Sequence, residues 1–148
     1  MKKIFSHLLL GNIVYKVSIN TPFEKVFQTL SKAISNNDFS VVAVHDLKNT
    51  FIKANLDIPL DFEYRIVQLC NAKKAHKVIT EMSYDMGIMM PKSIIIAFEN
   101  GETTLRFMQM KSWMIGMMFP SVDIVPMSKR VMATMKKIID EVVLESGK

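Results

Sequence analysis

The fold is decided by the stretch Arg65-Ile66-Val67-Gln68-Leu69-Cys70-Asn71-Ala72-Lys73-Lys74-Ala75. The run of residues 62–69 is rich in aromatic and β-branched residues and predicts a strand. Asn71 is a residue type that caps helices. We therefore predict a helix from that point, with an apolar face made of Ala72, Ala75, Val78, Ile79 and Met82. Cys70, the only cysteine of the chain, then lies where a strand meets a helix.

Three further elements are predicted before this junction. Residues 13–19 alternate between apolar and polar and predict a half-buried strand. Thr21-Pro22-Phe23-Glu24 is typical of a helix start, with Thr21 as the cap and Glu24 completing a capping box. Residues 39–47 predict a second strand. The predicted helix between them has an apolar stripe at helical spacing: Phe23, Val26, Phe27, Leu30, Ala33 and Ile34.

The stretch between the second and third strands is less regular. Residues 49–56 are compatible with a short helix. Residues 58–60 are expected to be irregular, because a proline at position 59 removes a backbone donor.

After the junction, a hairpin and a long helix are predicted. Residues 93–99 and 103–110 form the hairpin about Asn100-Gly101, a pair suited to positive φ. Residues 84–91 are a connection, and residues 111–120 an irregular apolar segment. Residues 126–145 predict a helix with Lys136–Asp140 and Lys137–Glu141 pairs on its exposed side. Its buried stripe is expected to contain Met127, Val131, Met135, Ile138, Ile139, Val142 and Val143.

The predicted order is βαββαββα, an α+β fold in which helices pack on a mainly antiparallel sheet. A length of 148 residues, with 49% hydrophobic and 22% charged residues, fits one compact globular domain over residues 1–148.

The net charge of +5 comes from lysines in small groups, and no basic motif with interleaved aromatics is present. We therefore do not expect nucleic-acid binding. No run approaches the ~20 apolar residues of a membrane span, so a membrane is not an expected partner.

A single cysteine excludes an intramolecular disulfide and a metal site made of cysteines alone. This favours a reducing compartment, and the expected location is the cytoplasm. Export is the alternative, because Lys2-Lys3 and the apolar residues 4–10 imitate a signal peptide. Ser6 and His7 interrupt that run, and no small-residue cleavage site follows it.

Three motifs occur in a familiar order: residues 42–47 (Val-Ala-Val-His45-Asp46-Leu47), residues 69–75 (Leu-Cys-Asn-Ala-Lys-Lys-Ala), and Gly87-x-x-Met90-Pro91 before a strand. In these motifs the chain resembles the bacterial and archaeal domain-of-unknown-function family numbered 302, over about residues 13–110. The Met-rich loop and C-terminal helix, residues 111–148, are similar to the family only in outline. The resemblance implies a compact α+β fold, often a homodimer, without an established activity. Many members carry a second cysteine after the proline, where this chain has Lys92, so two-cysteine chemistry is not expected here.

Cys70 is the first candidate for chemistry, with His45 as its possible base. If Asn71 caps a helix, Cys70 lies near unpaired N–H groups and the positive end of the helix dipole, and Lys73 and Lys74 add positive charge. Such surroundings favour the thiolate. The plainer interpretation is that Cys70 is a small buried hydrophobic residue and His45 an ordinary surface histidine.

The first functional hypothesis is a homodimeric small-ligand-binding domain with Cys70 near the site and Asn71, Lys73, Lys74 and Pro91 as candidate ligand contacts. The alternative is a single-cysteine protein that handles thiols or persulfides. A weaker alternative is haem or metal binding through Cys70 or His45. No metal ligand set and no cofactor are predicted, and enzyme status is left open because it depends on Cys70 alone.

Methionine is unusually frequent, and eight of the 13 methionines fall between Met108 and Met135. Thioethers suit Cu(I), but adaptable packing or a partner surface is the favoured interpretation. Residues 111–120 are too apolar to face water comfortably. We therefore expect a homodimer contact that includes Trp113, Met117, Met118 and Phe119.

Overall fold

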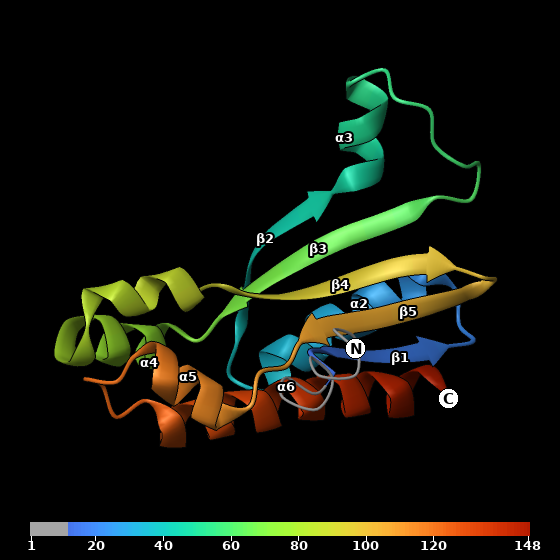
Figure 1. Cartoon of the computed structure of the whole chain (residues 1–148). Coiled ribbons are helices and arrows are strands. Elements are labelled where there is room, and N and C mark those ends of the chain that lie inside the picture. The colour runs from blue at the N-terminus through green and yellow to red at the C-terminus, as the bar shows by residue number, and fades with distance from the viewer. Residues whose placement is uncertain (1–11) are drawn as a thin grey trace, which may run out of the picture.

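The computed structural model describes residues 12–148 and contains one five-stranded sheet (Figure 1). Every neighbouring pair of strands is antiparallel, and the spatial order is β1-β5-β4-β3-β2. The predicted α+β class is confirmed. The signal-peptide-like residues 2–10 lie outside the described residues. The strands are β1 (Val14–Ile19), β2 (Ser40–Asp46), β3 (Glu63–Cys70), β4 (Lys92–Glu99) and β5 (Glu102–Met108).

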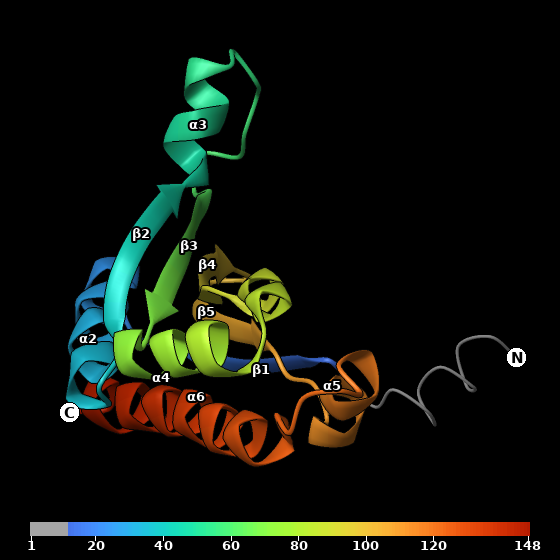
Figure 2. The same ribbon diagram turned by 90° about the vertical axis from the view of Figure 1, so that its left-hand side faces the viewer.

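Two helices, α2 (Phe23–Asn36) and α6 (Val125–Ser146), cover one face of the sheet and form the main core with it (Figure 2). The predicted stripe of α2 is buried, with Phe27 at its margin. On α6 the predicted stripe holds except for Val143, which is exposed because it lies beyond the edge of the contact with α2 and the sheet. The fully buried side chains of this core include Val26, Leu30, Ile34, Val67, Leu69, Ile94, Ile96, Leu105, Met135, Ile138, Ile139 and Val142. Each contributes on the order of 1.5–3 kcal/mol relative to exposure.

The predicted capping box at the start of α2 is wrong. Pro22 occupies the N-cap position, and no side chain caps the helix. Thr21 instead donates from Oγ1 to the carbonyl of Ser146 at the end of α6, at 3.0 Å. Glu24 instead forms an ion pair with Arg65 of β3, so contacts between elements replace the local cap.

The predicted i,i+4 ion pairs on α6 are also absent from the described residues. The carboxylate of Glu141 accepts hydrogen bonds from the side-chain amides of Asn36 and Asn37, at 2.6 and 2.8 Å. The ammonium of Lys136 lies 5.6 Å from the centroid of the Tyr15 ring. Partners on α2 and β1 are therefore preferred to neighbours on the same helix.

The hairpin about Asn100-Gly101 is confirmed. Glu99 and Glu102 are paired, and the two residues between them have φ of +53° and +80°. Two positive φ values in a two-residue loop match the twist of the strands that it joins.

At one end of the sheet, α3 (Leu47–Lys53) and the loop after it project away from the core (Figures 1 and 2). The helix begins earlier than the predicted 49–56, because Asp46 caps it by accepting a hydrogen bond from the backbone N–H of Asn49 at 3.1 Å. Residues 58–60 are irregular, as predicted.

At the other end, a group of short helices gathers beside the N-terminal part of α6. They are α4 (Ala72–Lys77), the π-helix η1 (Val78–Met82), the 3-10 helix η2 (Tyr84–Met89) and α5 (Ser112–Met118). The prediction that residues 111–120 are irregular is wrong. Helix α5 packs closely on α6, since a Cβ atom at Gly116 would lie 2.8 Å from Cγ2 of Val125.

This end of the molecule has its own apolar core, the methionine cluster. Its buried members are Val78, Met86, Ile115 and Ile124, and the partly buried side chains around them are Met82, Met89, Met90, Met110, Phe119, Val122 and Met127. None of the helices within residues 12–148 is long and apolar enough to cross a bilayer.

Candidate functional site

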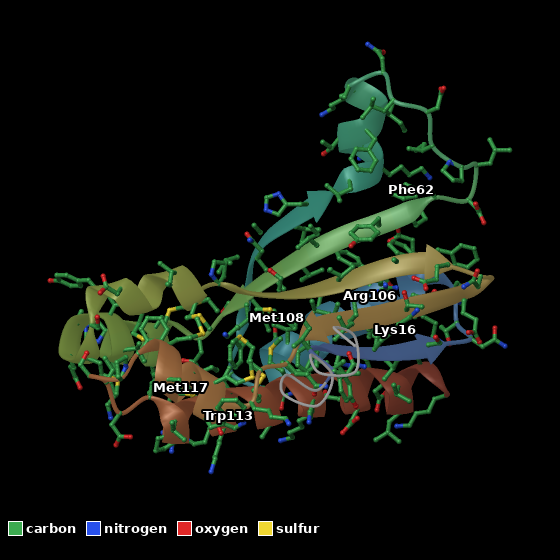
Figure 3. All side chains as sticks on the ribbon, in the orientation of Figure 1. Lys16, Phe62, Arg106, Met108, Trp113 and Met117 are labelled. Carbon is green, nitrogen blue, oxygen red and sulfur yellow. The ribbon has the colours of Figure 1, made fainter. Side chains whose placement is uncertain are left out.

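The methionine cluster borders a half-open cavity of about 60 Å³ between α6 and the short helices. Sulfur atoms gather at this α4 and α5 end of the molecule (Figure 3). The apolar lining consists of Val78, Met86, Met89, Met90, Ile115, Ile124, Met127, Val131 and Met132. Two polar side chains, Lys92 and Ser128, complete the wall. A mostly apolar lining with a few polar residues is typical of small-molecule sites, although those are usually several times larger.

A second cavity of about 60 Å³ adjoins the first, because Val78, Met90, Lys92, Met127 and Val131 line both. Its remaining lining comes from the junction between β3 and α4 and from the residues around it: Phe39, Leu69, Cys70, Asn71, Lys74, Ala75 and Pro91. The Met90–Pro91 peptide bond, which is cis, lies in this wall. The two cavities therefore share a wall. We call them the two lobes of one candidate site, the first at the short helices and the second at Cys70.

Lys92 lies where the cavities meet. It is the first residue of β4, is paired with Leu69 of β3, and is partly buried. It also lines a third, larger cavity of about 360 Å³ near the start of β4 and the end of β5. Burial lowers the pKa of its ammonium group, and no ion pair among the described residues includes it. Lys92 is thus a cation in apolar surroundings without a countercharge from the described residues.

Ser128 of α6 supplies the second polar group of the first lobe. Its side chain is 7% exposed, and its Oγ has no hydrogen-bond partner among the described residues. A buried hydroxyl without a partner is costly, so most such groups in folded proteins are hydrogen-bonded. Ser128 belongs to the wall of the first cavity, but its hydroxyl oxygen is itself buried.

The structure gathers four of the residues singled out from the sequence. Cys70 is half-buried and lines the second lobe together with Asn71, Lys74 and Pro91. Lys73 is exposed and does not line it. The predicted helix start is confirmed, because Asn71 caps α4 by accepting a hydrogen bond from the backbone N–H of Lys74 at 3.0 Å.

His45 is not brought to Cys70. In the pairing of β2 with β3, His45 lies opposite Ile66, whereas Cys70 lies opposite Ser40. The two are therefore separated by ~13 Å along the strands, at ~3.3 Å per residue. His45 Nε2 lies instead 3.3 Å from Oε1 of Gln68. The two residues cannot share a proton, a haem iron or a metal ion at this distance. Within residues 12–148 no group of three His, Cys, Asp or Glu side chains could hold a metal ion.

Lys92 and Ser128 were not predicted as site residues from the sequence. Lys92 was noted only as a replacement for cysteine, although a lysine that opens the apolar run Ile94-Ile95-Ile96 was a usable signal. Ser128 stands one helical turn after Ile124 and within the apolar stripe that continues at Val131. A polar residue on a buried stripe was the signal there.

The residues of the expected dimer contact lie on and beside α5. Trp113, Met117 and Met118 are 48%, 72% and 50% exposed, and Figure 3 shows the first two on this helix. Phe119 instead packs against the methionine cluster.

Comparison with known proteins identifies relatives without assigning an activity. The family model "Domain of unknown function DUF302" matches residues 15–142. The match therefore includes β1 and continues past the 13–110 region of the motifs into most of α6. The crystal structure of an uncharacterized conserved DUF302 protein from Bacillus stearothermophilus is similar, with a TM-score of 0.75 and 19% identity. The alignment covers 88% of this chain and 98% of that chain, which shows a shared fold. No match was found among curated proteins.

Proposed function

Because this chain belongs to the DUF302 family, whose name carries no activity, we propose a function from its own cavities. The domain binds a small, mostly apolar molecule in the two-lobed site beside Lys92. This proposal keeps the first functional hypothesis from the sequence, in which Cys70 lies near the binding site. It differs in placing the centre of the binding site at Lys92.

One observation carries the proposal: two apolar lobes share a wall at Lys92, and Ser128, whose hydroxyl has no partner among the described residues, belongs to the wall of the first. Apolar walls supply affinity by removing apolar ligand surface from water, and the few polar groups orient the ligand.

The chemistry of the wall supports the same proposal. Methionine side chains are flexible and polarizable, so they adapt to ligands of different shape. Part of the wall is Val78, the first residue of η1, where the backbone N–H of Ser83 bonds to the carbonyl of Val78 at 3.0 Å in a π-helical pattern. π-helical turns are rare and are frequent at functional sites.

The test uses methionine methyl groups as reporters. Protein labelled with ¹³C at these methyls is titrated with hexanol, a short apolar probe. We expect shifts in the NMR signals of Met86, Met90 and Met127, which line the lobes, and none at the exposed Met117.

A pair of variants on α6 provides the control. Val131→Phe fills a position that lines both lobes and should abolish the shifts, whereas Val143→Phe places the same ring on the exposed side and should leave them intact. An unchanged spectrum in wild-type protein at saturating hexanol would refute the proposal. Equal binding by both folded variants would do the same.

Thiol or persulfide handling is a second candidate, favoured by the position of the only thiol on a cavity wall beside Lys74. His45 is not part of this candidate, because it is distant from Cys70. The measurement is the rate of reaction with an aromatic disulfide at pH 7, with Cys70→Ser as the blank. A native protein whose thiol reacts only after unfolding would remove this candidate.

We also propose that two copies of the chain associate through α5. The support is the exposure of Trp113, Met117 and Met118 on one short helix, since clustered exposed apolar side chains often mark interaction sites. Light scattering after size exclusion should give twice the chain mass, and Trp113→Ser with Met117→Ser should give the single mass. A monomer at high concentration would refute it.

A further inference from the structure

We infer that the third cavity, of about 360 Å³, is a further binding site, and that it takes a molecule with a fused aromatic ring system. This site is distinct from the two lobes and does not depend on the proposed function.

The third cavity lies in a fork between β4 and β5 (Figure 1). The pairing of the two strands ends at Ile95 and Arg106, although β4 begins at Lys92 and β5 runs to Met108. Within the described sheet, residues 92–94 pair with β3 alone and residues 107–108 with β1 alone. Both arms of the fork line the cavity: Lys92, Ser93 and Ile95 on β4, and Arg106, Phe107 and Met108 on β5. The division of the sheet therefore leaves room for a ligand between its strands.

The size and the exposure of the third cavity suit a small molecule. Its volume of about 360 Å³ lies within the range of ~300–1,000 Å³ that is typical of ligand pockets. The cavity is half-open, and three apolar side chains on its wall, Ile13, Val14 and Met108, are 42%, 43% and 59% exposed. Exposed apolar side chains that gather at one place often mark binding sites. A bound apolar molecule would remove their surface from water.

The apolar part of the wall favours an aromatic ligand over a saturated one. Met89, Met108 and Met135 contribute thioethers, and sulfur makes favourable contacts with the edges of aromatic rings. Phe107 contributes a ring, and pairs of aromatic rings attract each other by more than their buried area predicts. A saturated ring of the same size would gain only from the burial of its surface.

The charged residues of the wall favour the same class of ligand. Lys92 and Arg106 line the third cavity, no Asp or Glu does, and cations are attracted to the face of an aromatic ring. Arg106 points to the face of the sheet opposite α2 and α6, since Leu105 and Phe107 beside it are buried in the main core (Figure 3). Hydrogen bonds use the edge of a guanidinium, so its ion pair with Glu99 is compatible with a ring stacked on its face.

The experiment compares 2-naphthol with decahydro-2-naphthol, which share a fused skeleton and a hydroxyl group and differ in aromaticity. Calorimetry should show that 2-naphthol binds about fivefold more tightly or better, since sulfur–aromatic and cation–π contacts favour it alone. In full-length protein labelled with ¹³C at the methionine methyls, 2-naphthol should shift the NMR signals of Met108 and Met135. Of the three cavities, these two residues line only the third. Met86 and Met127 line the lobes and not the third cavity, so their signals should stay in place.

Two serines on strands provide matched variants. Ser93→Phe fills the third cavity and should abolish the binding of 2-naphthol. Ser18→Phe places the same ring at an exposed position of β1 that lines none of the three cavities, so binding should remain. Circular dichroism checks that both variants are folded. If Ser93→Phe does not fold, the methionine signals of the wild-type protein decide the location.

Each contrary outcome overturns this inference. If the shifts fall on Met86 and Met127 instead, the aromatic molecule occupies the lobes. If decahydro-2-naphthol binds equally tightly, the aromatic class is refuted. If 2-naphthol does not bind, the third cavity is not its site, and a Met108 signal that then changes on dilution of the protein would assign the cavity to a second copy. A failure of hexanol to shift the signals of the lobes would refute the proposed function alone.

Discussion

Arg65 of β3 and Glu24 of α2 form an ion pair across the boundary between the sheet and its covering helix, with Nη1 of Arg65 at 3.2 Å from Oε2 of Glu24. The same guanidinium lies over two rings of α2, 4.9 Å from the centroid of Phe23 and 4.6 Å from that of Phe27. One side chain thus holds the first turns of α2 to β3 through charge and aromatic contact together.

Replacing this arginine should loosen α2. Arg65→Met keeps an apolar stem and removes both interactions, so we expect a loss of about 1–2 kcal/mol in the free energy of unfolding. Urea unfolding followed by circular dichroism measures it. Arg130→Met, an exposed position on α6, is the control and should stay within about 0.5 kcal/mol of wild type. Equal effects of the two substitutions would contradict the conclusion that Arg65 holds α2 to β3.

Stability should decline in acid through two glutamates. The hydrogen bond from Arg65 holds the pKa of Glu24 below its ordinary value of 4.5, and hydrogen bonds from Lys16 and Arg106 do the same for Glu99. A carboxyl whose pKa is lower in the folded state stabilises the fold above pH 4.5 and loses that contribution as the pH falls through the lowered pKa.

Glu24 is largely exposed and Glu99 is partly exposed, so solvent screening keeps the contribution small. The measurement is the free energy of unfolding between pH 6 and pH 2. Glu99→Gln should make the decline shallower. A wild-type protein that gains stability over this range would contradict the prediction.

The cap of α4 should contribute measurably to stability. Asn71→Ala removes the acceptor for the backbone N–H of Lys74 and should cost about 1 kcal/mol, whereas Asn71→Asp should cost little because aspartate caps equally well. Thermal unfolding of the three proteins makes the comparison. If alanine and aspartate behave alike, the hydrogen bond has no role in stability.

Two leucines make a matched pair for the core. Leu30 of α2 is fully buried, whereas Leu60 lies fully exposed in the loop after α3. Leu30→Ala removes packed methyl groups and leaves a cavity, so we expect a loss of about 2–5 kcal/mol. Leu60→Ala should change the free energy of unfolding by less than about 0.5 kcal/mol. A large effect at Leu60 would instead mean that the loop after α3 makes a contact that is not seen in the structure of the single chain.

Two glycines should respond with opposite signs to alanine. Gly101 has a φ of +80° in the hairpin loop, where a Cβ atom is strained, so Gly101→Ala should cost about 1–2 kcal/mol. A Cβ atom at Gly87 in η2 meets no other atom within 4 Å, and its φ is not in the left-handed region. Gly87→Ala should therefore be neutral or stabilise by about 0.4–1 kcal/mol, by restricting the unfolded chain. Chemical denaturation of both variants provides the comparison.

The elements that the sequence predicted well are those with a local signal. The stripes of α2 and α6 follow from apolar spacing, the hairpin from Asn100-Gly101, and the start of α4 from Asn71. Helix α5 was missed because its residues are apolar on nearly every side, so no amphipathic period marks it. It forms where Gly116 allows close packing on Val125.

The sequence by itself determined the α+β order and the place of Cys70 at the end of a strand, because strand alternation, helical spacing and capping act between near neighbours. The tertiary structure alone decided the site. Lys92 meets the second lobe because the register of β4 sets it opposite Leu69, next to Cys70 in β3, and Ser128 meets the first lobe because α6 passes beside the short helices. The same register separates His45 from Cys70. Pairing between strands and packing between helices depend on contacts far apart in the chain, and no local pattern encodes them.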